Sequence, residues 1–356
     1  MNLSARERSY ASPLGMVTQE PNLTMLVGYL QSMRARILSE PGAHVLRFSR
    51  SHLDEVRSAF ARTIRQGEGR LHRLCALACR SFLRTSPYEL SSVVIGEVEH
   101  SGERFTLVQK LELDELFAHT DLDLGNRQLQ RLRFADQGSF RRALLVANFV
   151  EYQPEDSNSL GVHKLISRIK AEEEIWNKVV DEIFDLDALV QRDKQLRHMS
   201  RYIKDIFGVK IVVAEREAVR ACQRHLAGWR WSQEELAELN VPYEPGTYQL
   251  EFLEVKDYLS NKSSKGSGWR ALKSVVRWWD TTFEIQVQSL RNYFQERERL
   301  TRESHAGFKA RREQLRNQVA QVLPLFGFYR SLLRWLFLSP GEPAPSYPSV
   351  SIELTD

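Results

Sequence analysis

The sequence has few cysteines, no long apolar run and no large excess of charge, and each shortage excludes a class of protein. Its three cysteines, Cys75, Cys79 and Cys222, form no CxxC pair, so neither a disulfide framework nor a cysteine zinc site is expected. The longest apolar stretch, residues 323–338, is too short to span a bilayer and contains two arginines. The first 15 residues lack the apolar core of a signal peptide. These shortages predict a cytoplasmic protein with no transmembrane segment.

Charge is nearly balanced, with 50 Lys and Arg against 46 Asp and Glu and a net charge of +4. This mildly basic balance suits an anionic ligand but is too weak to predict nucleic-acid binding alone. A Gly-Lys-Ser/Thr phosphate loop is missing, and no third glycine follows Gly266 and Gly268. Phosphate binding would therefore depend on side chains.

Composition and periodicity predict two structural regions followed by a tail. Residues 1–150 are expected to form a mixed α/β module of unknown role, with a β-hairpin in residues 91–113. Residues 151–161, rich in Pro, Ser, Asn and Gly, are typical of a linker. The Pro- and Ser-rich residues 339–356 are expected to be disordered.

Between linker and tail, residues 162–312 alternate strand and helix patterns, which predicts an α+β fold with a mixed sheet flanked by helices. The predicted strands are residues 165–170, 208–215, 248–259, 274–279 and 282–290, and the last two are expected to form an antiparallel hairpin around Asp280 and Thr281. A charged helix is expected from about residue 290 to 321, and residues 313–338 form a C-terminal helical segment. This segment is expected to lie against the body of the protein, with contact at a membrane surface as the alternative.

Several polar side chains fall where they could bind a nucleotide. Alternation in the strand FEIQV places Glu284, Gln286 and Gln288 on one face, which either meets solvent or forms the floor of a polar cleft. Arg168 and Lys170 share a face of another strand. Further candidates are Lys178, two turns into the next helix, and Asp205, just before the strand at 208–213. The cationic loop 262–273 adds Lys265, Gly268, Trp269 and Lys273.

Taken in order, these residues resemble the motifs of the synthetase domain of RelA/SpoT-type alarmone synthetases. The similarity runs from about Leu165 to Lys309. It comprises an R-x-K strand with a later Lys, a D-x-x-G-x-R-I strand, a K-x-x-G-Y-x-S-L-H loop, an E-x-Q-I-R strand and an H-x-x-Y-K ending. The matching residues are Arg168, Lys170, Lys178, Asp205, Gly208, Lys210, Ile211, Lys265, Gly268, Trp269, Leu272, Glu284, Gln286, Val287, His305, Phe308 and Lys309.

The resemblance implies a nucleotidyltransferase-like fold that transfers pyrophosphate from ATP to the 3′-OH of GDP or GTP, with Mg²⁺ as cofactor. Asp205 and Glu284 would hold the metal, and Glu284 would also accept the proton of the attacking hydroxyl. ATP would be bound by Arg168, Lys170, Lys178 and Lys210. The acceptor would be bound by Lys265, Gly268, Trp269, Lys273 and Gln286, with the indole stacked on its base. His305 and Lys309 complete the pattern.

The sequence departs from the pattern at four positions: Lys210, Ala271, Lys273 and Gln288 stand where the family has Arg, Ser, His and Arg. These changes leave open whether the acceptor is GDP or GTP, an adenosine nucleotide, or the 3′-end of tRNA, as in toxin-type relatives. A third interpretation is a catalytically inactive module that senses nucleotides. Residues 1–150 offer no His-Asp pair with suitable partners, so synthesis without hydrolysis is expected. Homo-oligomerisation also stays open.

Overall fold

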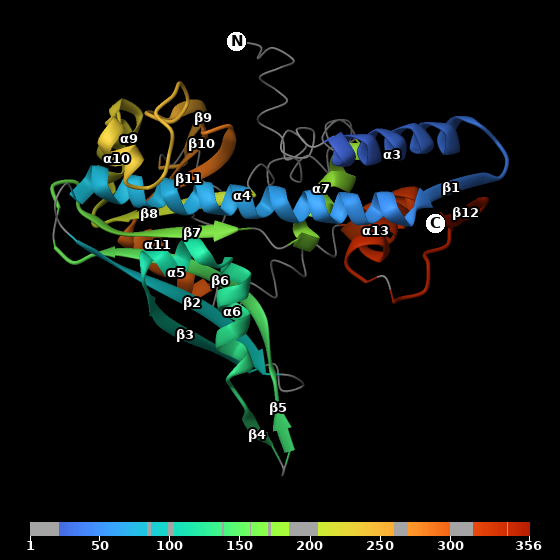
Figure 1. Ribbon diagram of the computed structural model, residues 1–356, viewed down its shortest axis with the longest axis horizontal. Helices are drawn as coiled ribbons and strands as arrows, with labels where there is room; N and C mark the ends of the chain where they lie inside the picture. The colour runs from blue at the N-terminus through green and yellow to red at the C-terminus, as the bar shows by residue number, and fades with distance from the viewer. Residues whose placement is uncertain are drawn as a thin grey trace. The chain divides into compact units, whose positions relative to one another are not determined.

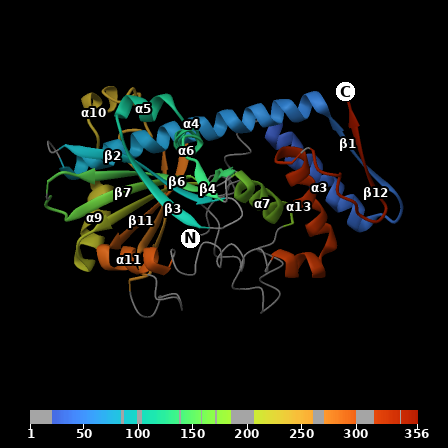
Figure 2. The same cartoon turned by 90° about the horizontal axis from the view of Figure 1, so that it is seen from below.

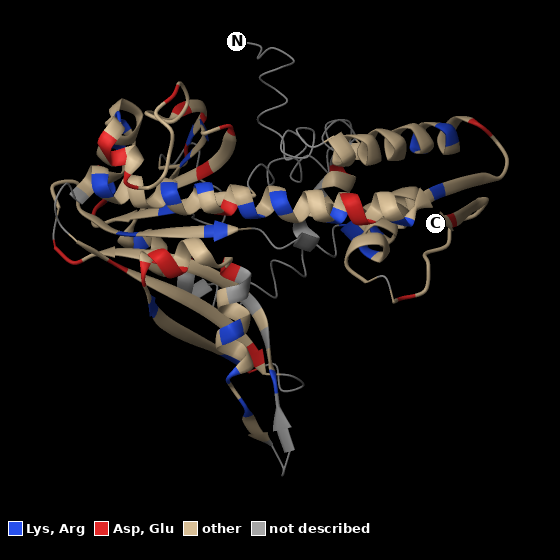
Figure 3. Ribbon diagram, viewed as in Figure 1, with Lys and Arg blue, Asp and Glu red and all other residues tan. Residues whose placement is uncertain are grey.

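The computed structural model describes residues 21–83, 87–98, 103–136, 139–156, 158–169, 172–184, 206–259, 270–299, 316–339 and 341–356 of the chain (Figure 1). The chain folds into two compact units, each made of segments that are far apart in sequence. Unit 1 comprises Met1–Ile64, Lys170–Ile206 and Arg299–Asp356; unit 2 comprises Arg65–Ile169 and Phe207–Glu298. Figure 3 shows acidic and basic residues interspersed within each unit.

A mixed sheet forms the centre of unit 2, and within the described residues it has eight strands. Their spatial order is β3 (Arg104–Leu111), β2 (Tyr88–Val98), β6 (Ala143–Pro154), β7 (Val162–Ile169), β8 (Phe207–Val213), β11 (Thr281–Ser289), β10 (Leu272–Trp278) and β9 (Glu251–Asp257). Neighbouring strands are antiparallel except β8 and β11, which are parallel. Helices flank this sheet, which confirms the predicted α+β class.

The two predicted hairpins are present in this sheet. β2 and β3 pair as expected for residues 91–113, and β10 pairs with β11. The turn of the second hairpin lies at Trp279 and Asp280, which both have positive φ, of 46° and 55°. Two positive φ values in succession are typical of the tight turns that match strand twist. The Trp279 amide donates to the carbonyl of Gly246 at 2.8 Å, and the Arg70 guanidinium lies 5.2 Å from the indole.

The predicted linker is wrong, because the chain does not leave the sheet there. β6 continues to Pro154, and β7 begins at Val162 and pairs with β6. Residues 155–161 therefore connect two neighbouring strands. The strands β2, β3 and β6 of the predicted N-terminal module extend the same sheet as β7 to β11.

The two faces of the sheet differ in chemistry. On one, here called the apolar face, side chains such as Phe207, Ile211 and Ile285 are buried beneath helices. Gly67 of α4 (Arg50–Leu83) allows this helix to approach the ring of Phe207. Helices α6 (Asp121–Gln130) and α9 (Arg216–Gly228) also contact the sheet. The opposite, polar face is covered by α11 (Leu290–Arg299); Figure 2 shows α11 and the second half of α4 on opposite sides of the strands.

Shorter elements complete unit 2. They are α5 (Leu113–Ala118), α10 (Gln233–Ala237) and the two-stranded pair of β4 (Phe134–Asp136) and β5 (Ser139–Arg141). Ser232 begins α10 with a capping box, in which its side chain accepts from the Glu235 amide and the Glu235 side chain accepts from the Ser232 amide. Cys75, Cys79 and Cys222 are buried free thiols.

Unit 1 is built from α3 (Pro21–Ser39), the first part of α4, α7 (Glu172–Ile183) and α13 (Pro324–Phe337). The apolar side chains of α13 lie in the interior of this unit. Phe184 contacts the rings of Phe326 and Tyr329 edge-on, and Trp176 stacks on Phe337 with 4.2 Å between ring centroids. Within the described residues, no helix has the length and apolar character needed to cross a membrane.

One expectation for the C-terminal region needs correction. The composition of the tail predicts disorder, but Val350–Thr355 forms strand β12, parallel to β1 (His44–Ser49). The hydrophobic and polar residues of β12 alternate, which is typical of a half-buried strand. Within the charged helix predicted from about residue 290 to 321, α11 extends to Arg299 and residues 316–322 are helical; residues 300–315 lie outside the described residues.

Candidate active site

The polar face carries a cluster of ionisable and amide side chains near its centre, on neighbouring strands. Glu284, Gln286 and Gln288 of β11 share this face, as their alternation predicts. In the register, Gln286 lies beside Lys210 of β8 on one side and Lys273 of β10 on the other. Glu284 is 1% exposed and Gln288 is fully buried, so of the two interpretations of this strand the solvent-facing one is wrong.

Glu284 is neutralised by side chains beside it in the sheet. Gln286 Nε2 donates to Glu284 Oε1 at 2.5 Å, and the ammonium group of Lys273 forms an ion pair with Oε2. A buried carboxylate is costly unless it is paired and hydrogen-bonded. Lys273 therefore supplies the charge that allows Glu284 to remain ionised inside the sheet-helix layer.

A second ion pair joins the sheet to α11. Lys210 Nζ lies 2.9 Å from Glu296 Oε2, and Gln288 Nε2 donates to the same oxygen at 3.1 Å. Burial favours a raised pKa for Glu296, but the charge and hydrogen bond of Lys210 and the bond from Gln288 outweigh it, and the pKa falls below its ordinary 4.5. Burial lowers the pKa of Lys210, and Glu296 opposes this shift.

Arg168 of β7 reaches the same area. A Cβ at Gly208 would lie 3.7 Å from Arg168 Nε, an ordinary contact distance, which places the Arg168 side chain beside β8. The positive charge of Arg168 contributes to lowering the pKa of both Lys210 and Glu296. Three basic side chains, Arg168, Lys210 and Lys273, therefore lie on one face.

Residues that the sequence did not single out complete this cluster. Lys164 Nζ lies 2.6 Å from Glu151 Oε2, and the ring of Tyr293 lies 5.7 Å from Lys164 and 6.0 Å from Lys210. Together with Glu296, these side chains hold the basic groups of the sheet. The signal in the sequence for Tyr293 and Glu296 is the position of α11 directly after β11, which brings the first turns of the helix back over the polar face.

The structure brings together five of the predicted site residues: Arg168, Lys210, Lys273, Glu284 and Gln286. The remaining predictions cannot be placed in this cluster. Lys178 lies in α7 of unit 1, and its side chain is outside the described part of the structure. Residues Lys170, Asp205, Lys265, Gly268, Trp269, His305 and Lys309 lie outside the described residues.

The cluster has the chemistry needed to bind a polyphosphate and to accept a proton. Guanidinium and ammonium groups bind phosphate oxygens by charge-assisted hydrogen bonds. A buried carboxylate can take a proton from a hydroxyl held within hydrogen-bond distance. The Glu284 carboxylate also suits Mg²⁺, which prefers oxygen ligands. The Lys273 ammonium lies beside this carboxylate, where such a metal ion would bind. The donor set fits the ion if the Lys273 ammonium turns away; Asp205, the second predicted ligand, is outside the described residues.

Comparison with solved structures finds alarmone synthetases. The small alarmone synthetase 1 of Bacillus subtilis matches with 15% identity over 40% of this chain and 61% of that protein, at a TM-score of 0.24. The same synthetase bound to its product pppGpp matches with 15% identity over 41% and 65%, at a TM-score of 0.26. A GTP pyrophosphokinase family protein from Streptococcus pneumoniae matches with 18% identity over 49% and 78%, at a TM-score of 0.22.

The chain spans 61% and 65% of the first two of these structures. No protein-family model and no curated protein sequence matches the chain. Because the identities and TM-scores are low, the case for a function depends on the side chains of the polar face and on the motifs they belong to.

Proposed function

We propose that the chain transfers pyrophosphate from ATP to the 3′-OH of GDP or GTP. The observation that carries the proposal is the placement of Arg168, Lys210, Lys273, Glu284 and Gln286 on one face of four adjoining strands. Four separate motifs of the resemblance contribute these residues, which supports the proposal. Basic groups lie to either side of a buried carboxylate.

In this proposal Arg168 and Lys210 bind the ATP phosphates and Gln286 orients the acceptor ribose. The acceptor 3′-oxygen attacks the β-phosphorus of ATP, and the bond between this phosphorus and the oxygen bridging to the α-phosphorus breaks. AMP leaves with that oxygen, while Glu284 accepts the proton of the 3′-OH. Bound Mg²⁺ would neutralise charge on the phosphates, with Glu284 as one of its ligands. Lys265, Trp269 and Lys273 would bind the acceptor, and Lys170, Lys178 and Asp205 the ATP and metal.

The Lys273–Glu284 ion pair supports a second candidate, a module that binds nucleotides without transfer. Lys273 stands where the family pattern has His. Its ammonium forms an ion pair with the Glu284 carboxylate, which would otherwise serve as base and metal ligand. If the pair persists when nucleotides bind, Glu284 cannot take up the hydroxyl proton. The basic face would still bind phosphates.

A transfer assay separates these candidates. Purified full chain is incubated with Mg²⁺ and γ-labelled ATP together with GDP, GTP, unlabelled ATP or bulk tRNA, and the label is followed. We expect label on GDP or GTP and none in Glu284→Gln, which should keep its ATP affinity. Label on tRNA or on an adenosine nucleotide would identify the toxin-type activity instead. Nucleotide binding without any transfer would identify the inactive module.

A further inference from the structure

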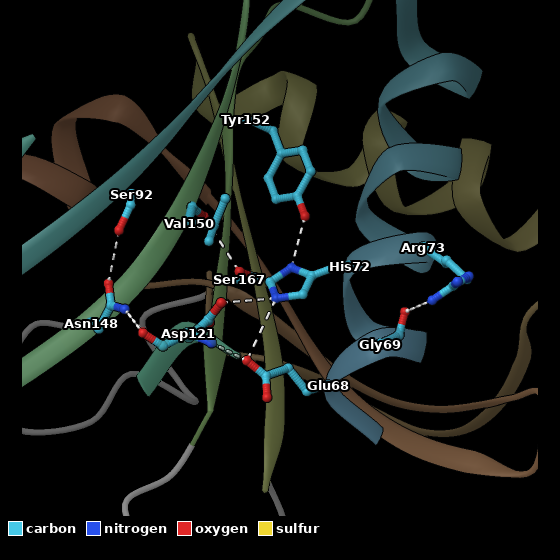
Figure 4. A network of polar contacts seen from close by, with 10 residues as sticks. All are labelled: Glu68, Gly69, His72, Arg73, Ser92, Asp121, Asn148, Val150, Tyr152 and Ser167. Carbon is cyan, nitrogen blue, oxygen red and sulfur yellow. Dashed lines mark hydrogen bonds and ion pairs between the residues drawn. The ribbon is translucent and has the colours of Figure 1, made fainter. Parts of the chain in front are cut away.

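A second polar cluster lies on the apolar face of the sheet, away from the candidate active site (Figure 4). It consists of Glu68 and His72 of α4 and Asp121 at the start of α6. All three side chains are buried: exposed fractions are 5% for Glu68, 1% for His72 and 5% for Asp121. Glu68 and His72 are four residues apart on one helix, so they project from the same side one turn apart.

The spacing of the cluster suits a divalent cation. One ligand atom from each residue lies within 4.8 Å of the others. His72 Nε2 is 2.9 Å from Asp121 Oδ1 and 3.9 Å from Glu68 Oε1. Metal–ligand bonds of about 2.0–2.2 Å in a tetrahedral site place ligand atoms about 3.4 Å apart, between these two values.

Neighbouring groups hold the three residues by hydrogen bonds, as is usual around metal ligands. His72 Nδ1 lies 2.9 Å from the hydroxyl of Tyr152, a contact that fixes the ring and leaves Nε2 directed at the two carboxylates (Figure 4). A histidine that binds a metal through one nitrogen usually donates from the other to an oxygen partner. The backbone of Asp121 is held on both sides: its amide donates to Glu68 Oε1, and its carbonyl accepts from Asn148 Nδ2.

One atom of the cluster has no partner. Asp121 Oδ2 is buried and accepts no hydrogen bond from any described residue. A buried carboxylate oxygen without a partner costs free energy, and natural proteins rarely leave one.

We propose that Glu68, His72 and Asp121 form a buried metal site that joins α4 to α6 in unit 2. One nitrogen and two carboxylate oxygens suit Zn²⁺ or Mn²⁺ better than Mg²⁺, which prefers oxygen ligands and keeps several waters. Burial of all three ligands indicates a structural role, in which the metal enters during folding. This site is independent of the proposed transferase activity, because it lies on the other face of the sheet.

Metal loading of the full chain tests the proposal directly. The protein is unfolded in urea with a chelator, refolded with Zn²⁺, Mn²⁺ or Mg²⁺, and desalted; bound metal and melting temperature are then measured. We expect about one equivalent of Zn²⁺ or Mn²⁺, little Mg²⁺, and a melting temperature above that of metal-free protein, since a ligand that binds only the folded state stabilises it. Wild-type protein that retains neither Zn²⁺ nor Mn²⁺ would overturn the proposal.

Variants locate the bound metal. Asp121→Asn keeps the size of the side chain but removes its charge, and should lose the metal and the gain in melting temperature. Tyr152→Phe removes only the contact to His72 and should weaken metal binding about 10–100-fold. His225→Gln is the matched control: His225 lies in the same unit, contacts the Ser81 carbonyl at 3.0 Å, and should leave uptake unchanged. Equal uptake by Asp121→Asn and wild type would show that the metal binds elsewhere and would refute the site. If Asp121→Asn does not fold, Tyr152→Phe decides: affinity equal to wild type would count against the proposal.

Discussion

Lys210 Nζ and Glu296 Oε2 lie 2.9 Å apart, and this ion pair fastens α11 to the centre of the sheet. The lysine that would bind ATP phosphates is therefore held by a carboxylate of the same unit. Gln288, also bound to Glu296, adds a second tie between strand and helix. The pair has consequences for stability and for ligand binding that can be measured separately.

Acid should weaken this pair only below the pH range in which an ordinary glutamate is protonated. The pKa of Glu296 is held below its ordinary 4.5, so its stabilising effect is complete above that value and is lost as pH falls through the lower, folded-state pKa. Glu296→Gln should be less stable than wild type by about 1–2 kcal/mol at pH 7, since it leaves Lys210 without a charged partner. Urea unfolding from pH 7 to pH 3.5 should show this difference constant above about pH 5 and shrinking below pH 4.5. A difference that does not change with pH would show that the charge of Glu296 is not responsible.

The same substitution tests competition between Glu296 and ATP, and this prediction depends on the proposed function. Removing the carboxylate frees Lys210 for phosphate oxygens, so Glu296→Gln should bind ATP several-fold more tightly by calorimetry. Glu353→Gln, which removes the exposed partner of Arg47 in unit 1, should leave ATP affinity unchanged. Weaker binding in Glu296→Gln would indicate that Glu296 positions Lys210 for ATP.

Lys273 and Glu284 should depend on each other for stability. Lys273→Met leaves a carboxylate that is 1% exposed without its cation, and should cost about 3 kcal/mol. The double variant Lys273→Met/Glu284→Gln removes the charge as well and should recover most of that loss. Urea unfolding of the four proteins measures the coupling. If the effects of the two single changes simply add, the ion pair contributes nothing.

The contact between α4 and β8 should tolerate no added side chain at Gly67. A Cβ there would overlap the ring of Phe207, which is fully buried. Gly67→Ala should therefore destabilise the protein by about 1–3 kcal/mol despite the better helix propensity of Ala. Gly28→Ala in α3, where nothing lies within 4 Å of the added atom, should stabilise it by about 0.5–1 kcal/mol. Thermal or urea unfolding compares the two; equal effects would contradict the packing argument.

Sequence patterns predicted the features that depend on neighbouring residues. Alternation in β11 placed Glu284, Gln286 and Gln288 on one face because the strand period is local. The antiparallel pairing of residues 274–279 with 282–290 was found for the same reason, although its turn lies at Trp279 and Asp280 and not at Asp280 and Thr281 as predicted. The resemblance added Arg168, Lys210 and Lys273, which the fold brings to that face.

Features that depend on distant segments could not be predicted in this way. Glu68 and Asp121 are 53 residues apart in the chain, and only the packing of α4 and α6 on the sheet brings them together. Pairing of β12 with β1 joins residues about 306 apart, and the Pro- and Ser-rich composition that precedes β12 obscured it. The extension of the sheet through β6 and β7 was missed because Pro, Ser and Gly mark a turn within a sheet as readily as a linker.

The interleaving of the two units sets the order in which they can be completed during synthesis. Every segment of unit 2 precedes Arg299, whereas unit 1 needs α13 and β12, which leave the ribosome after all of unit 2. Until α13 emerges, the Phe184 ring lacks the ring of Phe326 and the Leu30 carbonyl lacks the Tyr329 hydroxyl that donates to it; until β12 emerges, β1 has no paired strand among the described residues. The nascent chain therefore exposes apolar side chains and an unpaired strand for the whole time needed to translate the residues between α7 and α13. A chaperone would be needed during this interval.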